Sequence, residues 1–160
     1  MNSFFFPRLT KAFRLRLLLV TLLSVILFRY ILIPFNVQGL SMEPTIADGS
    51  LHFYSRLSYL FSQPNRFDIV TVRLAGNKVL LLKRIIAFAG ETVAFKQGKL
   101  FVDGKLMHEP QQMLPSDWEL EPRQVGKGKV YIVGDNRSVD ITQHRFGQID
   151  AQRILGKVVW

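Results

Sequence analysis

The longest run of apolar positions lies near the N-terminus, from Leu15 to about Phe35, and consists almost entirely of Leu, Val, Ile, Phe and Tyr. This length just reaches the roughly 20 residues that a helix needs to cross a bilayer. Pro34 ends the predicted helix, because its ring and its missing N–H disfavour continuation. The pattern predicts a transmembrane anchor over 15–35, preceded by a basic tail over 1–14.

A cleaved secretory signal peptide is the competing interpretation, since it also begins with basic residues followed by an apolar stretch. However, the run is long, and residues 35–38 offer no pair of small residues for cleavage. Arg29 argues against a spanning helix, because a charge at the bilayer centre costs about 2.5–3.5 kcal/mol. It lies toward the far end, where its long side chain can reach the headgroups. We therefore favour an uncleaved anchor.

Beyond residue 36, short apolar runs alternate with turn residues, which is typical of an antiparallel all-β domain. The segment 51–61 is unusually aromatic, and is either a core strand with a short helix or a surface that dips into the bilayer. The polar, Pro- and Gly-rich segment 108–128 predicts an irregular loop. Further strands are predicted over 68–74, 78–88 (after a turn at 75–77), 92–95, 99–102, 129–133 and 154–160.

The net charge of +9 is unevenly distributed, with five basic and no acidic residues before Ser41. Basic residues ahead of an anchor place the N-terminus in the cytoplasm and the rest across the membrane. The remainder is mildly basic, without the clustered Lys and Arg of a nucleic-acid groove, so no nucleic-acid partner is expected. Cysteine is absent and the three His are scattered, so we expect no thiolate nucleophile, no metal and no cofactor.

Three stretches carry candidate chemistry. Ser41, in Gly-Leu-Ser-Met-Glu-Pro-Thr over 39–45, is a possible nucleophile, although such a serine is often only a turn or helix-cap residue. Lys83 lies in an apolar run, where burial lowers a lysine pKa from about 10.4 and makes the amine a base. The alternative for Lys83 is an edge-strand lysine that prevents aggregation. A polar turn, Gly-Asp-Asn-Arg over 134–137, follows an apolar strand. Together they suggest a hydrolase, with the N–H groups of Ser41 and Gly39 as oxyanion donors.

These stretches resemble the conserved boxes of the type I signal peptidase (leader peptidase) family. Residues 39–46 are similar to its Ser-Met-x-Pro-Thr-Leu nucleophile motif, and 66–70 resemble the next box, with Phe67 where glycine is usual. Residues 83–91 resemble the Lys-Arg-Val-Val-Gly-x-Pro-Gly-Asp box that carries the base. Residues 134–137 match the start of the last box, and Gly147 falls at its closing glycine. The boxes occur in the family's order from the anchor to near the C-terminus.

The resemblance implies a single-pass serine endopeptidase of the cell (inner) membrane with a Ser41/Lys83 dyad. A compact domain of coiled antiparallel sheets over 36–160 would lie on the outer, periplasmic or extracytoplasmic face. It would cleave signal peptides of exported pre-proteins after Ala-x-Ala, acting as a monomer in contact with the bilayer. The oxyanion donors would be Ser41 and Gly39. Residues Phe35, Val37 and Leu82 would line the substrate pockets.

The chain departs from the family pattern after the last box begins. Asp140 falls where a serine is expected to bond the lysine, and Thr142 and His144 replace a structural ion pair. A carboxylate beside Lys83 would raise its pKa and weaken the base. Three alternatives remain: Asp140 points away, a shifted register places Ser138 there, or the enzyme is slow, specialised or inactive. The site-supporting residues are predicted to be Asp135, Asn136, Arg137, Ser138 and Asp140.

Other functions remain open at this point. One is a maturation peptidase for a dedicated conjugation- or pilus-type substrate, and another is a catalytically impaired relative that acts as a membrane-anchored binding subunit. Self-cleaving repressors also use Ser and Lys, but the anchor and the lack of a DNA-binding segment argue against them. The residues alone do not separate a bacterial membrane from an organellar one.

Overall fold

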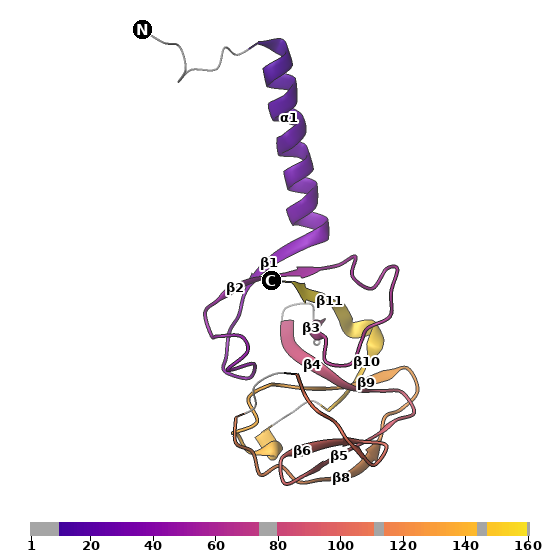
Figure 1. Cartoon of the computed structure of the whole chain (residues 1–160). Coiled ribbons are helices and arrows are strands. Elements are labelled where there is room, and N and C mark those ends of the chain that lie inside the picture. The colour runs from indigo at the N-terminus through magenta and orange to yellow at the C-terminus, as the bar shows by residue number, and fades with distance from the viewer. Residues whose placement is uncertain (1–9, 74–79, 111–113, 144–146, 160) are drawn as a thin grey trace.

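The structure is a computed structural model that describes residues 10–73, 80–110, 114–143 and 147–159. One helix projects from a body of β-strands, with the smaller sheet at the end far from the helix (Figure 1). The described strands pair antiparallel throughout, in one seven-stranded and one four-stranded sheet. The predicted mainly-β class is confirmed. The predicted turn at 75–77 and most of the basic tail lie outside the described residues.

The helix begins earlier and ends earlier than predicted. Helix α1 (Lys11–Ile26) starts after Thr10, whose hydroxyl accepts the Phe13 N–H at 3.2 Å as an N-cap. It continues as a π-helical segment, η2 (Leu27–Ile31), and strand β1 follows at once. The carbonyl of Ile31 accepts the Arg56 N–H at 3.0 Å, which ties the helix end to the sheet.

The predicted anchor boundary at Phe35 is therefore wrong, because 32–36 form β1 (Leu32–Asn36). Pro34 lies in this strand, and β1 is the edge of its sheet, where a missing N–H is tolerated. Among the described residues, no helix combines the length and the apolar character that crossing a bilayer requires.

The seven-stranded sheet has the order β1-β2-β11-β3-β4-β9-β10, so the C-terminal strand is inserted between β2 and β3. Strands β3 and β4 are central and mostly buried, which explains their nearly continuous apolar sequences. The remaining bounds are β2 (Leu51–Ser55), β3 (Ile69–Arg73), β4 (Leu80–Phe88), β9 (Lys129–Val133), β10 (Gln148–Asp150) and β11 (Ile154–Val159).

The four-stranded sheet has the order β7-β6-β5-β8. Strand β8 arises from the segment predicted to be an irregular loop, so that prediction is wrong. Four of its five side chains are exposed, which leaves no apolar pattern by which the sequence marks it. The bounds are β5 (Thr92–Lys96), β6 (Lys99–Val102), β7 (Lys105–Leu106) and β8 (Leu120–Gln124).

Residues 51–61 are divided between two structures. The first five form β2, as predicted, whereas residues 56–60 form turns, so the predicted short helix is wrong. The side chains of Leu60 and Phe61 are 63% and 89% exposed. Contact of this surface with a bilayer stays a prediction.

Three buried apolar clusters hold the domain together. One joins the two sheets through residues such as Ile86, Phe95 and Trp118, and a second packs on Val70 and Ile85. The third consists of Val37, Met42, Ile46, Ile69 and Val158. The third cluster includes residues on both sides of Ser41, so packing fixes the backbone that carries this side chain.

Candidate active site

Ser41 begins a turn that is anchored from both sides. Before it, the Val37 N–H donates to the Ser50 carbonyl at 2.9 Å, and the Gly49 N–H donates to the Val37 carbonyl at 3.0 Å. After it, Met42 is 1% exposed. Ser41 itself is half-buried. The backbone ladder and the buried methionine therefore leave the serine on a fixed segment rather than on a free loop.

Gly39 has a φ of +97°, a conformation that favours glycine. Its N–H donates to the Asp48 carboxylate at 2.8 Å. This N–H, predicted to be an oxyanion donor, is therefore engaged with Asp48 in the structure. Asp48 was not a predicted site residue, because an Asp-Gly turn signals only chain reversal.

Lys83 lies in the buried part of β4, opposite Val70 of β3, and is 6% exposed. Burial lowers the pKa of Lys83 from 10.5 to about 8, while the negative charge of Asp135 opposes this shift. The prediction that the apolar run would bury this lysine is confirmed. A substantial fraction of a buried amine with this pKa is neutral near physiological pH, as a general base requires.

The turn after β9 lies beside the strand of Lys83 and bonds the backbone of Ser41. Strand β9 pairs with β4 so that Val133 lies opposite Arg84, and the turn therefore begins alongside the neighbouring Lys83. From the same turn, the Asn136 N–H donates to the Ser41 carbonyl at 3.1 Å. Its side-chain amide donates to the Leu40 carbonyl, also at 3.1 Å. The three stretches singled out in the sequence thus meet at one turn.

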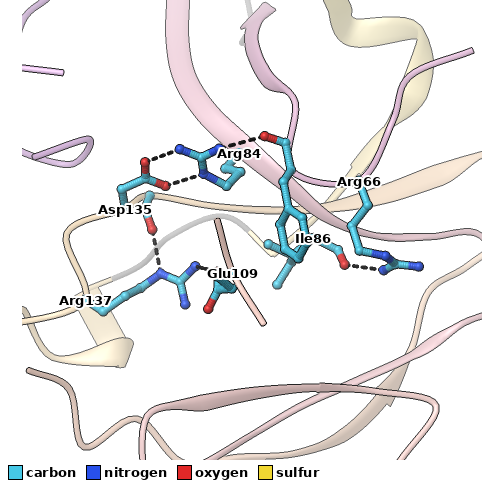
Figure 2. A network of polar contacts seen from close by, with 8 residues as sticks. Arg66, Arg84, Ile86, Glu109, Asp135 and Arg137 are labelled. Carbon is cyan, nitrogen blue, oxygen red and sulfur yellow. Dashed lines mark hydrogen bonds and ion pairs between the residues drawn. The ribbon is translucent and has the colours of Figure 1, made fainter. Parts of the chain in front are cut away.

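Asp135 in this turn is completely buried and forms an ion pair with Arg84 (Figure 2). Arg84 donates from Nε to one carboxylate oxygen at 2.8 Å and from Nη2 to the other at 2.5 Å. Its Nη1 donates to the Phe67 carbonyl at 2.7 Å. Such bidentate pairing compensates two charges for the loss of water. Asp135, predicted to support the site, therefore pairs with the residue that follows Lys83 in β4.

Asp140 points away from the buried lysine. Its carboxylate is exposed and accepts hydrogen bonds from the Thr142 hydroxyl at 2.6 Å and the Thr142 N–H at 2.7 Å. These two hydrogen bonds hold the pKa of Asp140 below its usual value. Ser138 bonds the Asn136 side chain instead, through its N–H at 3.2 Å and its hydroxyl at 2.6 Å. Of the three alternatives, the first describes the structure.

A cavity of about 270 Å³ lies beside Ser41. One wall is the segment 35–42 and the other is 80–82, so the cavity includes all three predicted pocket residues, Phe35, Val37 and Leu82. Lys83 is not among the described residues that line it. A larger cavity of about 520 Å³ near Tyr131 contains none of the predicted site residues.

Glu109 and Trp118 were not among the predicted site residues, and both contact Arg137, which was. Arg137 is buried against two aromatic rings and pairs with Glu109 at 2.8 Å. Glu109 and Trp118 both come from the segment predicted to be a loop, and a lone tryptophan in a polar stretch was the available signal. Within the described residues, no group of His, Asp and Glu side chains is placed to hold a metal ion.

Residues 10–160 match the family described as "Signal peptidase, peptidase S26". Signal peptidase I V of Bacillus subtilis is 33% identical over 80% of this chain and 84% of its own length. Thylakoidal processing peptidase 1 of Arabidopsis thaliana is 32% identical over 84% of this chain, but this chain spans only 43% of that protein. A crystal structure of a signal peptidase I from Enterococcus faecalis overlaps with a TM-score of 0.48 at 22% identity, over 61% of this chain and 98% of that chain.

Proposed function

The chain belongs to the signal peptidase family, peptidase S26, and we propose that Ser41 and Lys83 form its catalytic dyad. Membership of this family supports a serine endopeptidase that cleaves signal peptides. The observation that carries the proposed dyad is the burial of Lys83 next to the turn whose Asn136 N–H bonds the Ser41 carbonyl. An amine with a pKa of about 8 fits a base that works near neutral pH.

In the proposed reaction, the Ser41 Oγ attacks the scissile carbonyl while its proton moves to the Lys83 Nζ. The Ser41 N–H stabilises the developing oxyanion. Lys83 then gives the proton to the leaving amine, and an acyl-enzyme remains on Ser41. A water molecule, deprotonated by the same amine, releases the acyl group and restores the serine. The Gly39 N–H joins the oxyanion site only when its hydrogen bond to Asp48 opens.

The proposed substrates are exported pre-proteins with small residues before the cleavage site. The cavity beside Ser41 has a volume of about 270 Å³, and two of its lining residues, Phe35 and Leu82, pack against the third apolar cluster. An apolar wall of this kind suits small apolar side chains such as Ala. The peptide would add as a β-strand between the approach to Ser41 and the strand of Lys83.

We further propose that the N-terminal helix holds the catalytic domain at a lipid membrane. None of the α1 side chains is buried against the domain, and the exposed ones include Leu18 at 67% and Leu22 at 57%. An apolar helix without a protein partner matches a lipid environment. The orientation, with the N-terminus cytoplasmic and the domain on the outer face, remains the prediction drawn from the basic tail.

The decisive experiment is cleavage of an Ala-x-Ala pre-protein by the detergent-solubilised full chain. Ser41→Ala and Lys83→Ala are each expected to abolish cleavage, whereas Lys129→Ala, at an exposed ion pair, is a control that retains it. Binding of the pre-protein by all variants, with no cleavage by the wild type, would instead favour a binding subunit. Carbonate extraction of membranes, compared with a chain that begins at Leu32, tests the attachment.

A further inference from the structure

A buried arginine links the turn at the candidate active site to the smaller sheet. Arg137 is 1% exposed, and its guanidinium carbon lies 5.1 Å from the ring centres of both Phe95 and Trp118. Phe95 belongs to β5, and Trp118 precedes β8. A guanidinium stacked on aromatic faces is attracted by their negative π-surfaces. The smaller sheet and the segment before β8 therefore contact a residue of the turn that also carries Asp135 and Asn136.

Polar contacts fix the turn on both sides of this arginine. Arg137 donates from Nε to the Gly134 carbonyl at 2.6 Å and from Nη2 to Glu109, a 6% exposed carboxylate, at 2.8 Å (Figure 2). The Trp118 indole N–H donates to the Val139 carbonyl at 2.7 Å. We refer to Phe95, Glu109, Trp118 and Arg137 as the arginine clamp.

Burying Arg137 in the core has a cost in folding free energy. Burial disfavours the charged form of Arg137, which lowers its pKa despite the nearby carboxylates. Its Nη1 is buried without a hydrogen-bond partner within the part of the chain that the structure describes. An apolar side chain of similar volume would avoid both penalties. These costs argue that the arginine is retained for the position it imposes on the turn, as well as for packing.

Between the two ends of the clamped turn lies Asn136, which bonds the carbonyls of Leu40 and Ser41. We propose that the arginine clamp is a positioning device. Through it, the smaller sheet holds the turn so that the side chains of Ser41 and Lys83 keep their positions relative to each other. Glu109 and Trp118 are thus positioning residues and do not touch the substrate. This inference rests on the proposed dyad. It assigns a role in the reaction to the small sheet, which contributes no residue of the dyad.

Glu109→Gln in the full chain tests the proposal, since it keeps the size of the side chain and removes its charge. The control is Glu91→Gln, which removes the acidic partner of Arg66, 2.6 Å away; the Glu91 carboxylate bonds Arg66 and the Phe88 N–H rather than the turn. Cleavage kinetics, thermal unfolding and hydrogen exchange of the Asn136 amide are measured in all variants. We expect Glu109→Gln to lower kcat by about tenfold or more, with KM changed less than about twofold, because misplaced reacting groups slow the chemistry more than binding. Exchange at Asn136 should also accelerate.

Glu91→Gln should lower stability while kcat and the exchange at Asn136 stay at the wild-type values. The proposal is overturned if Glu109→Gln loses stability but keeps wild-type kcat and exchange, which would make the clamp a purely structural pair. Trp118→Phe keeps an aromatic ring beside Arg137, but it removes the N–H to Val139 together with part of the ring system. If Glu109→Gln does not fold, Trp118→Phe is tested in its place, and its kcat should also be lower than that of the wild type.

The exchange measurement also separates the two proposals. A wild-type chain that shows no Ser41-dependent cleavage, but in which Glu109→Gln accelerates Asn136 exchange, contradicts the dyad and leaves the clamp as the element that holds the turn. Active wild-type protein with unchanged Glu109→Gln kinetics and exchange contradicts the clamp alone.

Discussion

Both carboxylate oxygens of Asp135 accept hydrogen bonds from Arg84, at 2.8 and 2.5 Å, deep in the domain. The residue before that arginine, Lys83, experiences the same carboxylate only through its charge, which raises the pKa of Lys83 against the larger effect of burial. One carboxylate therefore stabilises a structural ion pair and tunes the proposed base. Because burial outweighs the attraction of this carboxylate, Lys83 keeps a lowered pKa.

Asp135→Asn is predicted to change stability and pH dependence together. Removing one member of a buried ion pair leaves the other uncompensated, which costs about 3–5 kcal/mol of unfolding free energy. Loss of the negative charge also lowers the pKa of Lys83, so the acid limb of the pH–rate profile should move to lower pH. Urea denaturation and the profile of kcat/KM check the two effects. A stable variant with an unshifted acid limb contradicts both.

Lys83→Met is predicted to abolish cleavage and stabilise the fold. Holding the amine charged when its pKa falls from 10.5 to about 8 costs on the order of 3 kcal/mol. The unfolded chain binds more protons than the folded one between those pKa values, so wild-type stability rises with pH through that window. The gain from methionine should therefore be greatest below about pH 8 and shrink toward pH 10.5. Urea melts across this range test it, and a gain that does not depend on pH would refute the buried-amine argument.

Asp140→Ser is predicted to leave activity equal to that of the wild type or slightly higher. Its exposed carboxylate bonds Thr142, and the acidic side chain that influences Lys83 is Asp135. The acid limb of the kcat/KM profile should lie near the lysine pKa, at about 8, in both proteins. A large loss of turnover in this variant would show that Asp140 takes part in the reaction.

Phe67 is predicted to store backbone strain. Its φ is +71°, which is unfavourable for a residue with a side chain, whereas its ring packs against the first apolar cluster. Phe67→Gly loses this packing and relieves the strain, and Phe67→Ala loses the packing alone. We expect the glycine variant to be more stable than the alanine variant by about 1 kcal/mol, the cost of the left-handed conformation. Equal urea midpoints for the two variants would mean that no strain is stored there.

Much of the fold follows from apolar patterning. The runs that became β4, β5, β6, β9 and β11 were recognisable because their buried side chains leave continuous or alternating apolar sequences. Strand β8 exposes most of its side chains, and β1 continues an apolar helix without a break in composition. In both cases pairing with another strand decides the structure, and such pairing leaves no local trace.

The candidate site divides in the same way. Burial of Lys83 was predictable from its apolar neighbours, and Ser41 was recognisable as a candidate nucleophile from its motif. The orientation of Asp140 was not, because a short bond to Thr142 competes with any distant partner and only coordinates reveal which one forms. The Arg137 contacts join residues 28 positions apart or more, at Glu109 and Phe95, which no local pattern connects.

The helix and β1 meet at Ile31 without an intervening loop, and the Arg56 N–H holds that junction at 3.0 Å. A hinge is therefore missing at the place where a tethered enzyme would be expected to swivel. If the helix is the tether, the serine operates at one fixed height above the lipid. Precursors whose cleavage bond lies a few residues nearer or farther would then be discriminated by distance, before their side chains are compared.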